Sequence, residues 1–340
     1  MNVLSLIWRV PASWLYGLVV AIRNELYDMH LLRSYKMSVP TVCVGNLTVG
    51  GTGKTPHIEW LVQALTDKYQ VAVLSRGYKR KSKGFVLSNA HSTVNDLGDE
   101  CMQLHRKFPY LPIAVCRDRV EGVRRLKEQL PDLQVVLLDD AFQHRRLICG
   151  FNILLTIADN LYTNDHLLPW GRLRDNKQQS HRADVVIVTK CQPQMTDLDR
   201  RTLINQLHLP PYQHIFFSQT QYAPLPPNID ILSPQTPVLL ITGIAQPNDL
   251  LHFLQQRFHH LQHLAFADHH SFSKSDCKQI EQAAQQATVV FTTEKDWSRL
   301  ESLPLSDTCR QKIFPIPIKA QVREENDVLQ LIERYIRSCI

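Results

Sequence analysis

The sequence predicts an α/β protein with a doubly wound, mostly parallel β-sheet and a smaller C-terminal α/β domain. Short apolar runs of the kind that form strands buried on both faces recur along the chain, and stretches with helical periodicity separate them. This alternation is typical of parallel sheets covered by helices on both sides. In the larger part we expect strands at residues 42–44, 71–75, 113–116, 135–140, 153–156 and 185–189.

Composition suggests where the domains begin and end. At 340 residues the chain is long enough for one large or two ordinary domains. Five prolines between residues 223 and 237 predict a linker. We therefore expect an N-terminal helix, the main sheet, this linker, a second α/β domain and a terminal helix, at residues 1–30, 31–222, 223–237, 238–325 and 326–340.

Charge and cysteine content exclude several classes of protein. The net charge is +6, but no basic block alternates with aromatic residues, so we expect no nucleic-acid partner. Mild basicity fits an acidic substrate or an anionic membrane surface equally well. The eight cysteines are scattered without a C-x-x-C pair, which argues against zinc sites and a disulfide framework and indicates a reducing compartment.

The N-terminal segment is apolar but short. Between Arg9 and Arg23, thirteen residues carry no charge, fewer than the roughly 20 that a membrane-spanning helix needs. Aromatic residues at 8, 14 and 16 suit a membrane interface, and no signal-peptide cleavage site follows. Three interpretations stay open: a helix lying in the membrane interface, which we favour, a short span, or a helix buried against the protein.

Residues 41–56, TVCVGNLTVGGTGKTP, have the order of a phosphate-binding loop: strand, glycine-rich turn, Lys-Thr and helix. Glycines let backbone N–H groups surround a phosphate, and the helix N-terminus adds positive charge. Lys54 would reach the β- and γ-phosphates, and the Thr55 hydroxyl would ligate Mg²⁺. Thr48 stands where the common pattern has its first glycine, so a glycine-rich turn without function is the alternative. The loop predicts a P-loop NTPase-like fold.

Charged residues follow the predicted strands. Asp139 and Asp140 end an apolar run, as in the Walker B pattern that holds Mg²⁺, although a turn or helix cap would look the same. Asp99 and Glu100 follow Gly98 and could accept a proton during phosphoryl transfer or simply complement a helix dipole. Strand ends in parallel sheets meet at one edge, so we expect a common site for Lys54, Asp99, Arg117, Arg119, Asp139 and Asp140.

Histidines crowd the second domain without convincing metal-ligand spacing. His269 and His270 beside Asp268 are the exception, because an Asp–His pair can orient or tune a proton acceptor. The other histidines are expected to be solvated or to cap helices.

Several segments in fixed order carry a family resemblance. They are VGNLTVGGTGKTP (44–56), SRGY (75–78), GDE (98–100), DDAFQHR (139–145), LPWGRLRD (168–175), GI (243–244), FADHH (266–270) and TEKD (293–296). Together they closely resemble the tetraacyldisaccharide 4′-kinase family, the lipid A 4′-kinases of Gram-negative bacteria. The apolar N-terminal helix fits as well, because the family has a membrane-attached N-terminus.

The resemblance implies ATP-dependent transfer of the γ-phosphate to the 4′-hydroxyl of a lipid-linked disaccharide 1-phosphate, in lipopolysaccharide lipid A biosynthesis. It implies association with the cytoplasmic face of the inner membrane, with ATP and Mg²⁺ as cofactors and no obligate protein partner. Asp99 would be the base, supported by His269. The triphosphate would be held by Thr48, Val49, Gly50, Gly51, Thr52, Gly53, Lys54 and Thr55. Mg²⁺ would be held by Thr55 with Glu100, Gln143 or the Asp139–Asp140 pair, and substrate by Arg119, Arg174 and Asn46.

Two departures from the family pattern bear on the site. Ala141 replaces the glycine of the usual Asp-Asp-Gly-Phe-Gln-His, and would strain the turn by about 1 kcal/mol or more if that position needs positive φ. The usual Leu-Pro-Ala-Gly-Pro-Leu-Arg-Glu has Trp170, Arg172 and Asp175 here. The bulkier side chains are expected to reshape the substrate side.

Two other functions fit a nucleotide-binding loop. The chain could be a P-loop NTPase that acts as a switch or insertion factor on a protein partner, or a membrane-associated binder with a degenerate nucleotide site. Protein-stimulated hydrolysis without a phosphorylated lipid would indicate the first, and undetectable ATP binding the second.

Overall fold

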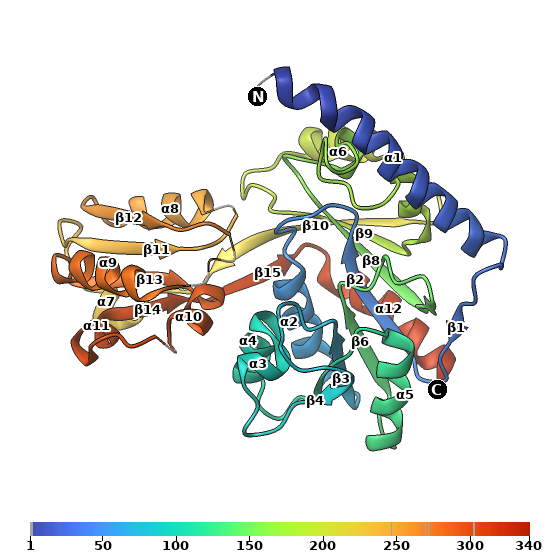
Figure 1. Cartoon of the computed structure of the whole chain (residues 1–340), viewed down its shortest axis with the longest axis horizontal. Helices are drawn as coiled ribbons and strands as arrows, with labels where there is room; N and C mark the ends of the chain where they lie inside the picture. Colours follow the sequence, from blue (N-terminus) through green and yellow to red (C-terminus); the bar gives the residue numbers. More distant parts are fainter. Residues whose placement is uncertain (1–2, 246, 269, 271, 302) are drawn as a thin grey trace. The chain divides into compact units, whose positions relative to one another are not determined.

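The structure, a computed structural model, describes residues 3–245, 247–268, 270, 272–301 and 303–340. The chain forms two compact units, whose elements are labelled in Figure 1. The first consists of Met1–Gln221 and Lys319–Ile340, and the second of Tyr222–Ile318.

A nine-stranded sheet forms the centre of the first unit. Its order is β15 (Ile318–Val322), β10 (His214–Tyr222), β9 (Val185–Thr189), β8 (Phe151–Ile157), β2 (Thr41–Asn46), β6 (Val135–Asp139), β3 (Val71–Ser75), β5 (Ile113–Val115) and β4 (Val86–Leu87). From β10 to β5 every pairing is parallel, and β4 runs antiparallel to β5. A small separate pair joins β1 (Tyr35–Lys36) to β7 (Leu147–Ile148). The predicted doubly wound, mostly parallel sheet is confirmed.

Helices cover both faces of this sheet. Val42 and Val44 of β2 face one apolar core, to which α2 (Lys54–Leu65), α4 (Asp99–Lys107) and α12 (Glu325–Cys339) contribute. Cys43 between them faces the other core, with α5 (Arg119–Gln129) and α6 (Asp197–Leu207). Alternate side chains of a strand thus pack into two different cores, as expected for strands buried on both faces. Because β2 lies between β8 and β6, the loop after it emerges in the middle of the sheet's carboxyl edge.

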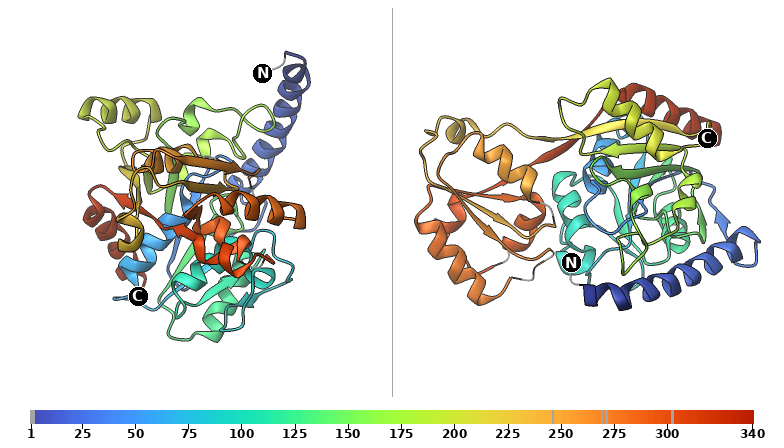
Figure 2. Two further views of the ribbon diagram at one scale, coloured as in Figure 1. Left: turned by 90° about the vertical axis from the view of Figure 1, so that its left-hand side faces the viewer. Right: turned by 90° about the horizontal axis from the view of Figure 1, so that it is seen from above.

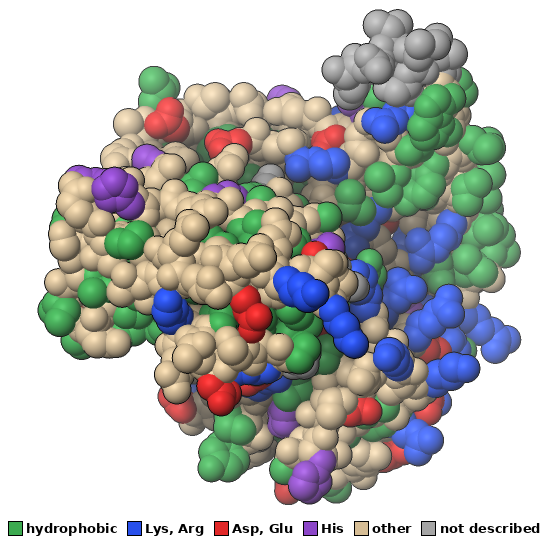
Figure 3. All heavy atoms as spheres, turned by 60° about the vertical axis from the view of Figure 1, so that its left-hand side comes forward, with side chains coloured by type: hydrophobic (Ala, Val, Ile, Leu, Met, Phe, Trp, Pro, Cys, Tyr) green, Lys and Arg blue, Asp and Glu red, His purple; other side chains and the backbone are tan. Residues whose placement is uncertain are grey.

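The predicted N-terminal helix is present as α1 (Val3–Asp28), which lies along the outside of the first unit (Figure 2). Ser13, Val20 and Asn24 form a buried stripe at helical spacing. Hydrophobic side chains gather on one side of the molecule in Figure 3. The large apolar residues exposed on α1 are Trp8, Trp14, Leu15, Leu18, Val19 and Ile22. Among the described residues, no helix combines the length and apolar character needed to cross a membrane.

The structure differs from the predicted boundaries at two places. Residues 223–237 are not a free linker: they lie in the second unit, where Ile229 of α7 (Pro227–Asp230) is buried in its core. Before the predicted end of the second domain at residue 325, the chain forms β14 (Ile313–Ile316) and β15. Pro317, which has no N–H to donate, stands between them, and from Lys319 the chain belongs to the first unit. Residues 319–325 are therefore outside the second domain.

The second unit is a smaller α/β layer structure. Its parallel four-stranded sheet has the order β12 (Leu261–Ala265), β11 (Val238–Thr242), β13 (Val289–Thr293) and β14. Leu239 and Ile241 face a core with α9 (Lys274–Gln285), whereas Val238 and Leu240 face a core with α8 (Asn248–Gln255). Two further helices, α10 (Glu294–Leu300) and α11 (Asp307–Lys312), complete the unit.

Candidate active site

The glycine-rich loop between β2 and α2 is fixed by a distant segment. Thr48 forms a β-bridge with Leu173, and Val49 N donates to Arg172 O at 2.7 Å. Thr48 is 7% exposed, so the residue in the usual glycine position serves to attach the loop. Gly53 has φ 89° and caps α2 without a side chain, which leaves backbone N–H groups at the helix start for an anion.

Asn46, at the end of β2, is the residue on which several site contacts converge. Its amide nitrogen donates to Thr52 Oγ1 at 2.8 Å, and its side-chain oxygen accepts from Lys54 Nζ at 3.4 Å and from Arg174 Nη2. Its carbonyl oxygen accepts from Gln143 Nε2 at 2.6 Å. Asn46 is 0% exposed, and its polar atoms bond to the loop and to the residues around it.

The two carboxylates at the end of β6 have opposite environments. Asp139 accepts from Ser75 Oγ at 2.9 Å through one oxygen, while the other is buried without a hydrogen-bond partner among the described atoms. Burial, followed by the charges of Glu100 and Asp140, raises the pKa of Asp139 to about 6. Burial also acts to raise the pKa of Asp140, but Lys54 and Arg174 hold it well below its ordinary value.

Asp140 carries the unusual backbone conformation of this turn. Its φ is 51°, in the left-handed region that Asp tolerates better than most residues, and its N–H donates to Val44 O at 3.0 Å. Ala141 is not among the described residues with positive φ and is 6% exposed. The strain expected from alanine at this position is therefore absent, because the positive φ falls one residue earlier.

Asp99 and Glu100 are the first two residues of α4, and both are half-buried. Gly98 before them has φ 86°, and a Cβ there would lie 2.5 Å from Tyr78 O, so this turn requires glycine. The influence of Glu100 on the pKa of Asp139 places their carboxylates in one electrostatic neighbourhood. The turn thus brings an acidic helix start to the edge where β6 ends.

Arg119, expected to recognise phosphate or substrate, is 3% exposed. Its guanidinium donates to Arg117 O at 3.0 Å and to Asp140 O at 3.4 Å, and burial lowers its pKa. The structure therefore places the Arg119 guanidinium against the backbone carbonyls of Arg117 and Asp140. No periodicity in the sequence signals this burial, because the residue begins a helix next to a charged strand end.

His269 lies outside the described residues. In the same unit His270 Nε2 is 3.0 Å from Asp276 Oδ2, and the His270 carbonyl accepts from Arg299 Nη1 at 3.1 Å. Arg299 also pairs with Asp296, which is 0% exposed and accepts from Gly243 N at 2.9 Å. Asp296 and Arg299 thus connect the GI and DHH segments. We did not predict them as site residues, although Asp296 belongs to the TEKD segment and Arg299 follows it by three residues.

A cavity of about 520 Å³ lies between α1 and the LPWGRLRD segment of the first unit. Its lining is largely apolar and includes Trp14, Gly17, Leu18, Leu167 and Trp170. The Trp170 ring stacks on His166 with centroids 3.8 Å apart, so the residue that departs from the family pattern forms part of the wall. The Arg172 side chain turns to Asp165 instead, with Nε 3.0 Å from Oδ2.

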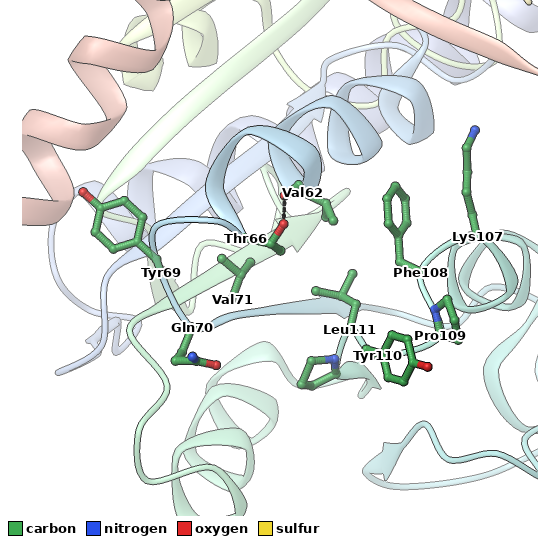
Figure 4. A pocket seen from close by; sticks show the side chains of 11 residues that line it. Val62, Thr66, Tyr69, Gln70, Val71, Lys107, Phe108, Pro109, Tyr110 and Leu111 are labelled. Atoms are coloured by element: carbon green, nitrogen blue, oxygen red, sulfur yellow. Dashed lines mark hydrogen bonds between the residues drawn. The ribbon is translucent and has the colours of Figure 1, made fainter.

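A second cavity of about 380 Å³ lies at the opposite edge of the same sheet (Figure 4). It is lined by Gln70 and Val71, where β3 begins, by residues just before β5, and by the last turns of α2 and α4. Amino-terminal ends of parallel strands point away from the edge that carries the glycine-rich loop. This cavity is therefore separate from the candidate active site.

Comparison with known proteins supports one family. The profile of the family described as Tetraacyldisaccharide-1-P 4′-kinase matches residues 6–337. A protein of Bacteroides fragilis named tetraacyldisaccharide 4′-kinase is 42% identical over 351 residues, which cover 97% of this chain and 93% of the relative. One of the same name from Flavobacterium johnsoniae is 40% identical, with 91% of each chain covered. A solved structure of LpxK from Aquifex aeolicus in complex with ATP has a TM-score of 0.74 at 27% identity and covers 98% of both chains.

Proposed function

The chain belongs to the tetraacyldisaccharide-1-P 4′-kinase family and is therefore a kinase of lipid A biosynthesis, and we propose how its residues divide the work of phosphoryl transfer. The observation that carries the proposal is that Lys54 and Arg174 each contact both Asn46, at the end of β2, and Asp140, directly after β6. Positioning and charge neutralisation supply most of the catalysis in such reactions.

ATP is the phosphoryl donor, in keeping with the ATP complex of the related structure. We assign the triphosphate to the loop of residues 48–55 and to the Lys54 ammonium; the Val49 and Thr52 N–H groups already donate to Arg172 O and Gly50 O, so other N–H groups of the loop would face the phosphates. Lys54 Nζ is 3.7 Å from Asp140 Oδ1 and 3.4 Å from Asn46 Oδ1, so these two residues hold its ammonium group next to the loop. A β- or γ-phosphate oxygen is the stronger partner for this ammonium once nucleotide binds.

Magnesium fits the donor set of this site. A divalent cation would give the buried, unpartnered oxygen of Asp139 a partner, and it would favour the charged form of a carboxyl whose pKa burial raises. We favour Asp139, Glu100 and Thr55 as its holders, because Asp140 is already neutralised by Lys54 and Arg174 and Gln143 donates its amide to Asn46. Mg²⁺ in kinases takes one or two carboxylates together with phosphate oxygens, and it supplies neutralisation of their charge.

Asp99 is proposed as the base. Its carboxylate takes the proton from the 4′-hydroxyl as that oxygen bonds to the γ-phosphorus and the bond from phosphorus to the β–γ bridging oxygen breaks, releasing ADP. Glycine at position 98 fixes where Asp99 begins α4. On the family's motif we also propose that His269 supports Asp99. Arg174, in contact with Asp140 and Asn46, orders the nucleotide loop in this scheme.

The lipid part of the substrate needs an apolar surface next to the loop. The 520 Å³ cavity beside α1 adjoins Leu173, which bridges to Thr48 of the loop, and we assign an acyl group to it. The exposed apolar face of α1 would lie in the membrane interface, with Trp8 and Trp14 at headgroup level. We place the protein at the cytoplasmic face of the inner membrane, since ATP and a reducing environment are found on that side.

The test is incubation with γ-labelled ATP, Mg²⁺ and the disaccharide 1-phosphate lipid in mixed micelles, followed by separation of lipids. Label should enter a glycolipid with the wild-type chain and not with Lys54→Ala. Lys68→Ala is the matched control, because Lys68 forms a surface pair with Glu333 and its side chain is 55% exposed. Hydrolysis of ATP without a labelled glycolipid would contradict the proposal and indicate an NTPase that acts on another partner.

A further inference from the structure

The core-facing side of α1 is more polar than an anchor requires. Four side chains on it make hydrogen bonds to distant parts of the first unit: Ser13 Oγ to Leu167 O at 2.8 Å, Tyr16 OH to Arg174 O at 2.9 Å, Arg23 Nη2 to Gln143 O at 2.8 Å and Asn24 Nδ2 to Asp175 Oδ1 at 2.7 Å. Their partners belong to only two segments, residues 140–145 and 167–175. Arg145 of the first segment returns a contact to Asn24 O at 2.9 Å.

These two segments are the ones that hold the nucleotide loop. From Tyr16 the contacts run through Arg174 to Asp140, and Asp140 is paired with Lys54. From Arg23 they run through Gln143 to Asn46, which also binds Lys54. Two chains of contacts thus connect α1 to the Lys54 ammonium that is proposed to hold the triphosphate. One passes through Arg174 and Asp140, and the other through Gln143 and Asn46.

Burial makes these contacts selective for one placement of the helix. Asn24 is 3% exposed and Asp175 is 0% exposed, so separating them would leave a buried carboxylate with the Asn176 N–H as its remaining donor among the described residues. At Gly17 the helix lies close to Leu167, because a Cβ there would lie 2.8 Å from Leu167 Cδ1. A rotation of α1 by one residue turns its side chains by about 100°, and all these contacts would be lost together.

We propose that α1 is a positioning element of the kinase site, in which Tyr16, Arg23 and Asn24 hold the segments that order Asn46, Asp140 and Lys54. The opposite, apolar face of the helix serves the membrane. The two faces of one helix therefore carry two separable tasks, attachment and site order. The inference rests on the proposed role of Lys54 at the triphosphate.

The experiment compares two sets of variants of the full chain. The inward set is Tyr16→Phe, which removes one hydroxyl, Arg23→Met and Asn24→Leu. The outward set is Leu15→Ser, Val19→Ser and Ile22→Ser, at positions that are 65%, 59% and 51% exposed on the face away from the core. Each variant is assayed for kcat and KM in mixed micelles, for recovery on vesicles of phosphatidylethanolamine and phosphatidylglycerol, and for folding by thermal denaturation.

We expect inward variants to lower kcat by about threefold to tenfold for each lost hydrogen bond, with vesicle recovery unchanged. Outward variants should lower vesicle recovery and raise KM for the lipid, with kcat in micelles retained. Arg23→Lys, which keeps a donor for Gln143 O, should recover much of the kcat that Arg23→Met loses. Rescue of this kind separates positioning from a loss of folded protein.

Wild-type kcat in Tyr16→Phe, Arg23→Met and Asn24→Leu together would overturn the inference. If Lys54→Ala were inactive in the same assay, the proposed function would survive that result. If Lys54→Ala were active, the role of the loop itself would be wrong. Equal losses of kcat and vesicle recovery in both sets would also overturn it, because the two faces would then have no separate tasks.

Discussion

Arg174 forms a two-pronged ion pair with Asp140, in which Nη1 lies 2.9 Å from Oδ2 and Nη2 contacts Oδ1. The same Nη2 group also contacts Asn46. The pair connects the LPWGRLRD segment to the end of β6, and both side chains are more than two-thirds buried. A planar guanidinium satisfies both oxygens at once, which a lysine ammonium cannot do.

Replacing Arg174 by lysine should therefore impair catalysis. We expect Arg174→Lys to lower kcat/KM by about 30- to 150-fold, since disrupting a largely buried charge pair costs on the order of 2–3 kcal/mol. The measurement is steady-state phosphorylation of the lipid at varied ATP. Arg172→Lys is the control, because the Arg172 side chain pairs with Asp165, and it should stay within about twofold of wild type. Equal losses in both variants would mean that the Asp140 contact has no special role.

Asp99→Asn tests the proposed base. The amide keeps the shape of the side chain but does not accept the hydroxyl proton, so kcat should fall by about 10² to 10⁴. ATP affinity, measured by calorimetry, should stay near the wild-type value because Asp99 is not assigned to the triphosphate. Asp96→Asn is the control, since Asp96 caps α3 (Val94–Leu97) three residues earlier. A wild-type kcat in Asp99→Asn would remove Asp99 as the base.

Ala141→Gly tests whether the turn after β6 is strained. Asp140, and not Ala141, has positive φ, so glycine at 141 should loosen the unfolded chain and remove one buried methyl group without relieving strain. The free energy of unfolding should fall by about 0.4–1 kcal/mol, with kcat unchanged. Urea denaturation and the kinase assay measure the two quantities. A more stable or a faster Ala141→Gly enzyme would show that alanine strains the site after all.

His57 predicts a loss of stability in acid. Its Nδ1 is 2.7 Å from Gly53 O, which only accepts, so Nδ1 carries the proton and Nε2 accepts from Ser218 Oγ at 3.0 Å. Burial lowers the pKa of His57 to about 4 from an ordinary 6.5. The unfolded chain therefore takes up a proton before the folded chain does, and stability contributed above pH 6.5 is lost as the pH falls.

At pH 5 the loss from His57 should be on the order of 2 kcal/mol relative to pH 7. Urea denaturation of the wild type and His57→Gln at both pH values isolates it, because the variant lacks the titrating group. The difference in unfolding free energy between the two proteins should shrink by that amount at pH 5. A difference independent of pH would contradict the prediction, and the exposed His91→Gln should behave as wild type.

The secondary structure that carries the site could be predicted from the sequence because its causes are local. Apolar runs such as 71–75 and 185–189 form strands where expected, and glycines with lysine and threonine mark the loop after β2. Fold class and family followed from these segments and their order. The strands β10 and β12 escaped prediction, because their sequences, HIFFSQTQY and LQHLA, mix polar residues with apolar ones.

Only the tertiary structure decided what the polar side chains do. The motifs suggested substrate roles for Asn46 and Arg119 but did not show that both side chains are buried, because burial depends on neighbours that come from distant segments. Asp140 and Arg174 are separated by 34 residues, and Asn24 and Asp175 by 151. No local pattern encodes such pairs. The sequence by itself determined the fold class, the loop and the family, because periodicity and glycine placement act over a few residues. The contacts that order the loop, in contrast, form only once the sheet has brought the separate segments to one edge.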